Sequence, residues 1–285
     1  MDTERRSYRF DVRTRETLYR RALESIPFQL LPKDDPQRLP VGHNRGDPVY
    51  FKTVETPLED TRARAVWFCS YMAAGAYPEG SSFEETVLQD QYECCTDRRW
   101  VGTYANGKVV ATARSLKADE VGHFQIHSES AGFGPLALPP NSIYGERLPE
   151  STEEIEATRE VSAFAVDLEG RTWQRDVLVG LIKVILNSFQ ETGVRYAYSS
   201  IDESFFHLVN YMGLRLEQVG RRSLYMGSIV VPSFFQVQAM IDNLLPEHQA
   251  LHAFMVGGDE FPPGSRYAFY RRVRSRQTAA NGGGR

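Results

Sequence analysis

The sequence predicts an α/β protein, in the wide sense that includes α+β folds, with a mixed central sheet and helices on both of its faces. Two observations support this fold class. Two apolar runs flank Asn106-Gly107, a pattern typical of an antiparallel hairpin. From Glu160 onward, strand-like and helix-like patterns alternate, which indicates parallel strands joined by right-handed crossover helices.

The composition limits the class of protein. With 285 residues, of which 41 % are hydrophobic, the chain can bury one large core or a smaller core with additions. The net charge of −4 argues against a nucleic-acid binder. No signal-like segment and no apolar run of about eighteen residues is found, so we expect a cytoplasmic protein without a membrane span. Its three cysteines are expected to be reduced thiols.

We expect three parts along the chain. Residues 1–58 form a basic, irregular extension, with a stretch that can be helical up to Ile26 and then several prolines. Residues 59–232 form the core. Residues 233–285 form a C-terminal extension that is helical over 233–256 and disordered at its end.

The first half of the core contains a helix and a hairpin. The helix is expected over residues 60–74, before a glycine-containing loop. The runs 101–105 and 108–116 are the strands of the hairpin, because Asn-Gly accepts the positive φ angles of a type I′ turn. Residues 117–158 are rich in Gly, Pro, Ser and Glu, so we expect a long excursion over the surface.

The second half of the core alternates regularly. The expected order is strand 161–168, helix 176–192, strand 195–201, helix 203–212 and strand 214–219. Asp202 is placed to cap the second helix. Side-chain alternation puts Ser162, Phe164 and Val166 on one face of the first strand. The crossover helix predicts that the first and second strands are parallel neighbours.

Four segments of the core carry a resemblance to a known group of enzymes. They are Arg64-Ala-Val-Trp-Phe68, Asp90-Gln-Tyr-Glu93, Val110-Ala-Thr-Ala-Arg114 and Glu160-Val-Ser-Ala-Phe-Ala-Val166. Their order and spacing resemble the GNAT acyltransferase fold, and in it the branch of the acyl-homoserine-lactone (autoinducer) synthases and N-acyl amino acid synthases. The resemblance covers roughly residues 58–232 and implies that the two parallel strands diverge at one end.

The chain also departs from this group. Ala163 stands where the signature usually has arginine, and Ala74 where the autoinducer synthases tend to have tryptophan. These changes affect a homoserine-lactone product more than acyl transfer to some other amine. Val209 replaces a tyrosine that CoA-dependent members often have, and the loop 168–176 has only Gly170 in place of their glycine-rich pyrophosphate cradle. The resemblance therefore implies an acyl-carrier-protein donor, with the acyl thioester as co-substrate and no bound cofactor.

Glu160 is the predicted catalytic base. An ammonium must lose a proton before it attacks a thioester, and a carboxylate that is buried beside a sheet has its pKa raised toward the working range. The alternative is a structural glutamate paired with an arginine such as Arg159. Ser162 shares the face of Glu160 and is expected to bind the carbonyl region of the donor or to pack as a small core residue.

The resemblance also implies residues that bind substrate. Arg114 would hold a carboxylate of the acceptor through its guanidinium fork, or else form a surface salt bridge. Asp90 and Glu93 would bind the ammonium of the acceptor or position Arg114, unless they cap a helix or lie on the surface. Three more residues are expected to line the same cleft: Arg64, Phe68 and Phe164. For Phe68, the alternative is plain core packing.

No metal site is predicted. The pairs His248/His252 and His123/His127 have helical spacing, but Gln249 replaces the glutamate of a zinc metalloprotease helix, so we interpret them as surface residues.

The sequence therefore favours a long-chain N-acyltransferase that uses acyl-carrier protein and an amino acid or similar amine. Arginines near both ends of the chain are expected to dock the acidic carrier. The alternatives are a CoA-dependent GNAT acetyltransferase and a non-catalytic GNAT-like module that binds a lipid or a partner protein.

Overall fold

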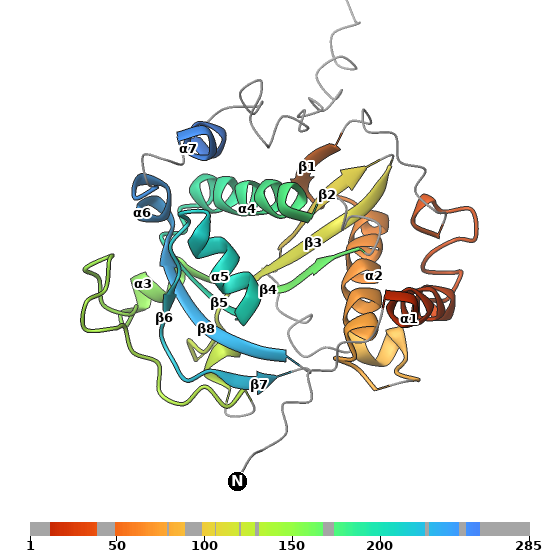
Figure 1. Ribbon diagram of the computed structural model, residues 1–285, viewed down its shortest axis with the longest axis horizontal. Coiled ribbons are helices and arrows are strands. Elements are labelled where there is room, and N and C mark those ends of the chain that lie inside the picture. The colour runs from red at the N-terminus through yellow and green to blue at the C-terminus, as the bar shows by residue number, and fades with distance from the viewer. Residues whose placement is uncertain are drawn as a thin grey trace, which may run out of the picture.

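The fold is built on one mixed sheet of eight strands (Figure 1). The computed structural model describes residues 12–38, 49–78, 80–88, 99–105, 107–119, 121–128, 131–167, 174–225, 228–244 and 249–256. The strands are β1 (Val49–Thr53), β2 (Arg99–Ala105), β3 (Lys108–Leu116), β4 (Thr158–Val166), β5 (Tyr196–Asp202), β6 (Glu217–Gln218), β7 (Ser223–Tyr225) and β8 (Ser228–Gln236). Their order is β1-β2-β3-β4-β5-β8-β6, and β7 pairs with β8.

Helices cover both faces of the sheet, which confirms the predicted fold class (Figure 1). On one face lies α2 (Pro57–Ala74), against which α1 (Val12–Ser25) packs. The other face carries α4 (Gln174–Glu191), α5 (Glu203–Tyr211), α6 (Val237–Asp242) and α7 (Gln249–Val256), while the short α3 (Thr152–Glu156) precedes β4. Within the described ranges, no helix combines the length and the apolar content needed to cross a membrane.

The helix expected over 60–74 is confirmed as α2 and begins one turn earlier than predicted. Thr56 and Glu59 form a capping box, with Pro57 at the first helical position. Gly75 ends the helix in the left-handed conformation, with φ of 75°. These local signals fix both ends, so the apolar side of α2 meets β3 and β4 in a defined register.

The hairpin and the parallel pair are also confirmed. β2 and β3 are antiparallel, and Gly107 has the positive φ of 77° that the turn requires. β4 and β5 are parallel from Thr158↔Tyr196 to Val161↔Ser199, after which no further pairs join these two strands. The crossover helix and the cap of α5 by Asp202 lie where they were predicted.

The C-terminal part corrects two expectations. Residues 228–236 form β8, antiparallel to β5, where a helical segment was expected from residue 233. β8 passes into α6 at Val237 without a loop, so the apolar residues of the strand and of the helix form one stretch, and the sequence does not mark the boundary between them. The strand expected over 214–219 is reduced to the two residues of β6, which pair with β8.

Residues 117–158 do more than run over the surface. Phe124, Ile126 and Phe133 from this segment are buried against Tyr198 and Phe234 of the sheet. The apolar residues of the segment have no strand or helix period, so the sequence pattern did not show that they pack. The segment covers the α2 side of β5 and β8 and closes the sheet there.

The division into extensions and core remains a prediction. β1, from the expected N-terminal extension, nevertheless pairs along its whole length with β2. α6 and α7, from the expected C-terminal extension, contribute buried side chains to the core cluster around α4.

Candidate active site

Glu160 lies in the middle of the sheet, between Leu116 of β3 and Tyr198 of β5. Its side chain is 1 % exposed, and its Oε2 accepts a hydrogen bond of 3.0 Å from the backbone N–H of Ile126. Burial raises the pKa of this carboxyl to about 7, while that hydrogen bond and the charge of Arg114 act in the opposite direction. The expectation of a buried carboxyl with a raised pKa is confirmed.

Arg114 lies next to it on β3, directly across from Ser162 on β4. Its Nε donates a hydrogen bond of 3.1 Å to Ser162 Oγ, and its guanidinium lies 5.1 Å from the centre of the Trp67 ring. Only 1 % of Arg114 is exposed, so the alternative of a surface salt bridge is wrong. A buried cation against an aromatic face and a hydroxyl is held in one orientation.

Further polar side chains surround this place on the α2 side. Burial raises the pKa of Tyr71 on α2 to about 12, with the charge of Arg114 acting against it and Tyr225 and Asp202 adding to it. The Tyr225 hydroxyl also accepts a hydrogen bond of 3.4 Å from Gln125 Nε2. Side chains from α2, β3, β4, β5 and β7 therefore act on one region, although they are far apart in the sequence.

Residues 123–127 lie beside Glu160, whose carboxylate accepts the hydrogen bond from Ile126. The ring of His127 meets that of Tyr198 edge to face, with centroids 5.6 Å apart, and meets that of His123 at 6.0 Å. Burial lowers the pKa of His127, and so does His123. Burial raises the pKa of Tyr198, and the nearby Glu160 adds to this shift. The phenol of Tyr198, which meets the His127 ring and lies near Glu160, therefore stays neutral.

A β-bulge in β4 corrects the predicted strand pattern. Ala163 has a positive φ of 50°, and the register with β3 shifts between Thr112 and Arg114. Phe164 and Val166 consequently pack against the α4 cluster, whereas Ser162 bonds to Arg114 above Trp67 of α2. Ser162 and Phe164 therefore point to opposite faces of the sheet, where strict alternation put them on one face.

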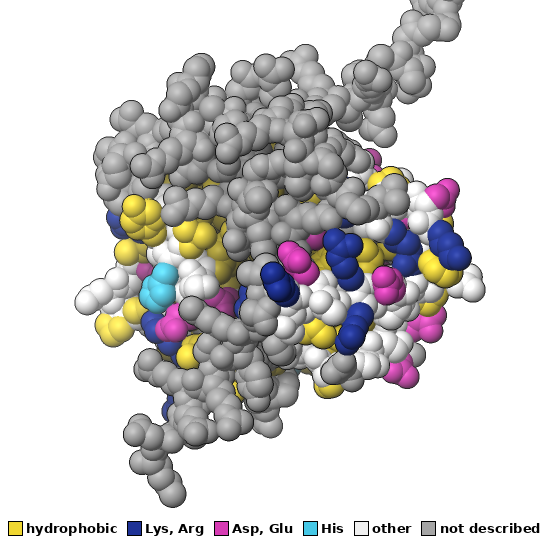
Figure 2. Space-filling model, turned by 45° about the vertical axis from the view of Figure 1, so that its right-hand side comes forward, with side chains coloured by type: hydrophobic (Ala, Val, Ile, Leu, Met, Phe, Trp, Pro, Cys, Tyr) yellow, Lys and Arg dark blue, Asp and Glu magenta, His cyan; other side chains and the backbone are white. Residues whose placement is uncertain are grey.

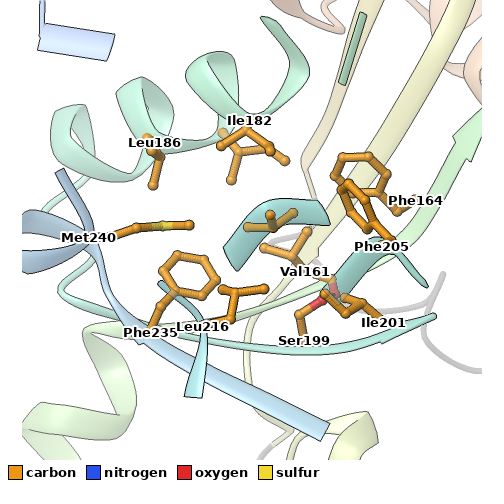
Figure 3. A pocket seen from close by; sticks show the side chains of 12 residues that line it. Val161, Phe164, Ile182, Leu186, Ser199, Ile201, Phe205, Leu216, Phe235 and Met240 are labelled. Carbon is orange, nitrogen blue, oxygen red and sulfur yellow. The ribbon is translucent and has the colours of Figure 1, made fainter. Parts of the chain in front are cut away.

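An apolar cavity opens on the α4 face where β4 and β5 separate (Figure 3). The space between atoms in the cavity and its open mouth together is about 420 Å³, of which about 40 Å³ can hold the centre of a water-sized group. Ser199 is the one polar residue of its lining, and its Oγ donates a hydrogen bond of 3.0 Å to the carbonyl of Val161. The other lining residues come from β4, α4, β5, α5, the connection before β6, β8 and α6: Val161, Phe164, Ile182, Ile185, Leu186, Ile201, Phe205, Val209, Leu216, Phe235 and Met240.

The remaining predicted residues are placed as follows. Arg64 is buried and forms an ion pair of 2.7 Å with Asp60. The side chain of Phe68 on α2 is packed in the hydrophobic core between α1, α2 and the sheet, which agrees with the alternative of plain core packing. Arg159 donates hydrogen bonds to the carbonyls of Glu156 and Thr158, and the cation acting on Glu160 is Arg114. The predicted pair of acidic residues, Asp90 and Glu93, lies outside the described residues.

Several residues of this region were not singled out from the sequence. Trp67 lies inside the quoted segment Arg64–Phe68, so its helical spacing from Tyr71 was a usable signal. The backbone N–H of Ile126 leaves no trace in a sequence, because any residue but proline supplies it. Phe205 and Met240 look like ordinary core positions until the strands are seen to separate.

No family model matches the sequence, and no curated protein matches it. Solved structures similar to the chain include FeeM, an N-acyl amino acid synthase from uncultured soil microbes, with 19 % identity and a TM-score of 0.48 over 71 % of this chain and 98 % of that one. TofI, in a ternary complex with an inhibitor and MTA, has 16 % identity and a TM-score of 0.47, with 70 % and 99 % of the chains covered.

BjaI, a CoA-dependent acyl-homoserine lactone synthase with bound SAM and isopentyl-CoA, has 12 % identity and a TM-score of 0.40 over 58 % of this chain and 67 % of that one. These structures belong to the groups that the four sequence segments resemble.

Proposed function

We propose that this protein is an N-acyltransferase that moves a long-chain acyl group from an acyl-carrier-protein thioester to the amine of an amino acid or similar acceptor. One observation supports it above the others. A buried carboxyl with a pKa of about 7, Glu160, lies on one face of the sheet where β4 and β5 separate, and an apolar cavity opens there on the other face.

Glu160 is proposed as the base. Amide formation joins the amine nitrogen to the thioester carbonyl carbon and breaks the carbon–sulfur bond. The acceptor ammonium loses two protons on becoming an amide N–H, one before the attack and one from the tetrahedral intermediate. The leaving thiolate takes up one proton and the other is released to solvent, so a group that accepts a proton from the nitrogen and returns one to the sulfur balances the reaction. A carboxyl with a pKa of about 7 is close to half ionised at neutral pH and suits both steps.

The buried cation beside it suits the acceptor. A bidentate guanidinium is the preferred partner of a carboxylate, so Arg114 would hold the carboxylate of an amino acid. Ser162, bonded to Arg114, would meet the carbonyl region of the donor. Asp90 and Glu93 would bind the ammonium of the acceptor, as the resemblance implies.

The apolar cavity suits the acyl chain. Its lining carries almost no polar group, and each methylene that leaves water contributes roughly 0.8 kcal/mol. An acetyl group would gain little from such a space. We therefore favour a long-chain donor over acetyl-CoA.

The carrier-protein donor is supported by sequence and charge. The loop 168–176 has a single glycine, too few for the usual pyrophosphate cradle. α1 carries four arginines and two glutamates, and three of the arginines (Arg13, Arg20 and Arg21) are exposed. An acidic carrier would be attracted to this helix.

The test is a comparison of donors with product identification by mass spectrometry. The purified protein is supplied with the same long acyl chain on carrier protein or on CoA, with acetyl-CoA, and with pooled amino acids. We expect N-acyl amino acids, formed faster from the carrier-protein thioester. Acetylated products alone would support a CoA-dependent acetyltransferase. Tight chain binding without any product would support a non-catalytic module.

A further inference from the structure

The inner end of the apolar cavity is formed by α6, a helix outside the core that the sequence predicted. Met240 of α6 enters the cavity from the side opposite Phe164 and Phe205 (Figure 3). Met240 is 3 % exposed and is surrounded there by Leu186 and Phe235. The cavity thus lies between an aromatic pair near the β4 bulge and a single methionine at the far end.

α6 is held firmly in this position. It packs against α4 and β8, and α7 packs against it. Leu251, Phe254 and Met255 of α7 are buried in the same cluster, and Lys183 of α4 lies 4.2 Å from the centre of the Phe254 ring. The backbone at this end of the cavity is therefore held in place. The Met240 side chain can still adapt, because methionine has several rotatable bonds and fills irregular spaces.

We propose that Met240 is the specificity-determining end stop for the acyl chain, so that α6 and α7 set the longest chain that the enzyme accepts. This inference rests on the acyl-transfer function proposed above. A chain entering beside Phe164 and Phe205 runs past Val161 and Leu216 and ends at the Met240 thioether. A longer chain has to displace that side chain or fold back on itself.

The physical effect is that of a pocket of fixed length. One methylene too many or too few in an apolar pocket changes specificity by roughly 10–200-fold. Met240→Ala removes about three methylene-sized atoms, so we expect the preferred chain to lengthen by about two carbons. Met240→Phe adds a ring that cannot turn aside, so we expect the preferred chain to become shorter.

The experiment measures kcat/KM over a ladder of acyl-carrier-protein thioesters that differ by two carbons. The enzymes are the wild type, Met240→Ala, Met240→Phe and a control, Gln238→Ala, on the exposed side of the same helix. Met240→Leu conserves volume and should keep the wild-type optimum, which shows that a shift in the other variants follows the size of the side chain. We expect opposite shifts of the optimum in the Ala and Phe variants and no shift in the control.

A second readout does not depend on turnover. Saturated fatty acids of increasing length are added to the same proteins, and the rise in melting temperature is followed until it stops increasing with length. This limit should move with the optimum of the thioester ladder. Amide products with an unchanged chain preference in both Met240 variants, and an unchanged fatty-acid limit, would overturn the end-stop role while acyl transfer stood. A shifted fatty-acid limit without any amide product would overturn the proposed function and retain Met240 as the end of a lipid cavity.

Discussion

The two faces of the sheet differ sharply where β4 and β5 separate. On the α2 face, Glu160 and Arg114 are buried as ionisable groups and are held by Ile126, Ser162 and Trp67. On the α4 face, the lining of the cavity is apolar apart from Ser199, whose hydroxyl is bonded to the chain itself. One face therefore carries buried ionisable groups, and the other an almost wholly apolar cavity.

A single strand supplies both faces. β4 gives Glu160 and Ser162 to the α2 side and, after the bulge at Ala163, gives Phe164 to the α4 side. Without the bulge, Phe164 would share the face of Ser162, and the polar region would contain a large apolar ring. A local break in alternation thus separates buried ionisable side chains from an apolar cavity within a few residues of one strand.

The largest expected effect is on the polar face. Glu160→Gln keeps the shape and the acceptor for Ile126 N–H but cannot take a proton. We expect acyl transfer to fall about 10²–10⁴-fold, roughly 3–5 kcal/mol of transition-state stabilisation. Steady-state kinetics on the folded variant gives the measurement, and circular dichroism confirms the fold. Near-normal turnover would rule Glu160 out as the base, and global unfolding would favour a structural role.

The buried carboxyl also predicts how stability depends on pH. The pKa of Glu160 is raised from 4.5 to about 7 in the folded state, so between these values the native protein holds a proton that the unfolded chain has lost. The favourable contribution is complete below pH 4.5 and disappears as the pH rises through about 7, a loss of about 3 kcal/mol in unfolding free energy. Urea unfolding of the wild type and Glu160→Gln at several pH values isolates this term. Identical pH dependence in the two proteins would contradict it.

Features that depend on local sequence patterns could be predicted, and features that depend on contacts between distant residues could not. The Asn106-Gly107 turn, the capping box at Thr56 and the crossover around α4 are local patterns, so the hairpin, α2 and the parallel pair were predictable. Glu160, Ser162 and Arg114 were found because they fall in segments that resemble a known family.

The rest depends on contacts between distant parts of the chain. The bulge reverses the pattern of β4 at an alanine, a residue that gives no warning of a positive φ. The hydrogen bond from the backbone N–H of Ile126 to the Glu160 carboxylate joins residues 34 positions apart, and β8 passes into α6 without a loop that would mark the boundary. These features follow from tertiary packing and carry no local pattern.

A smaller effect tests the bulge itself. At a φ of 50°, a β-branched side chain is strongly disfavoured, so Ala163→Val should cost about 1–3 kcal/mol of unfolding free energy or force the strand back into register. Ala163→Gly is the matched control, since glycine accepts this conformation freely. Chemical denaturation gives the free energies, and the chain-length profile shows whether Phe164 still faces the cavity. A Val variant with wild-type stability and profile would mean that the bulge is not needed to separate the two faces.

The smallest effects are expected far from both faces, on the exposed arginines of α1. Figure 2, which brings the side with α1 and α2 forward, shows basic and acidic side chains interspersed there, so no single charge dominates. Exposed ion pairs contribute about 0.2–1 kcal/mol each and are screened beyond about 8 Å at physiological salt, so several arginines must act together on an acidic carrier. We expect the combined change of Arg13, Arg20 and Arg21 to Ser to raise the KM for the acyl-carrier protein several-fold at low salt and little at high salt.

Two controls separate this attraction from damage to the enzyme. The KM for the same acyl chain on CoA should not change in the triple variant. Arg147→Ser, at an exposed arginine of the segment before α3, should leave both donors unaffected. Arg5, Arg6 and Arg9, outside the described residues, extend the series if the effect of the three is additive. If the KM for the acyl-carrier protein changes neither with salt nor with these substitutions, the arginines of α1 are solvated surface residues. That result would not affect the proposals for Glu160 and for the cavity, which have their own tests.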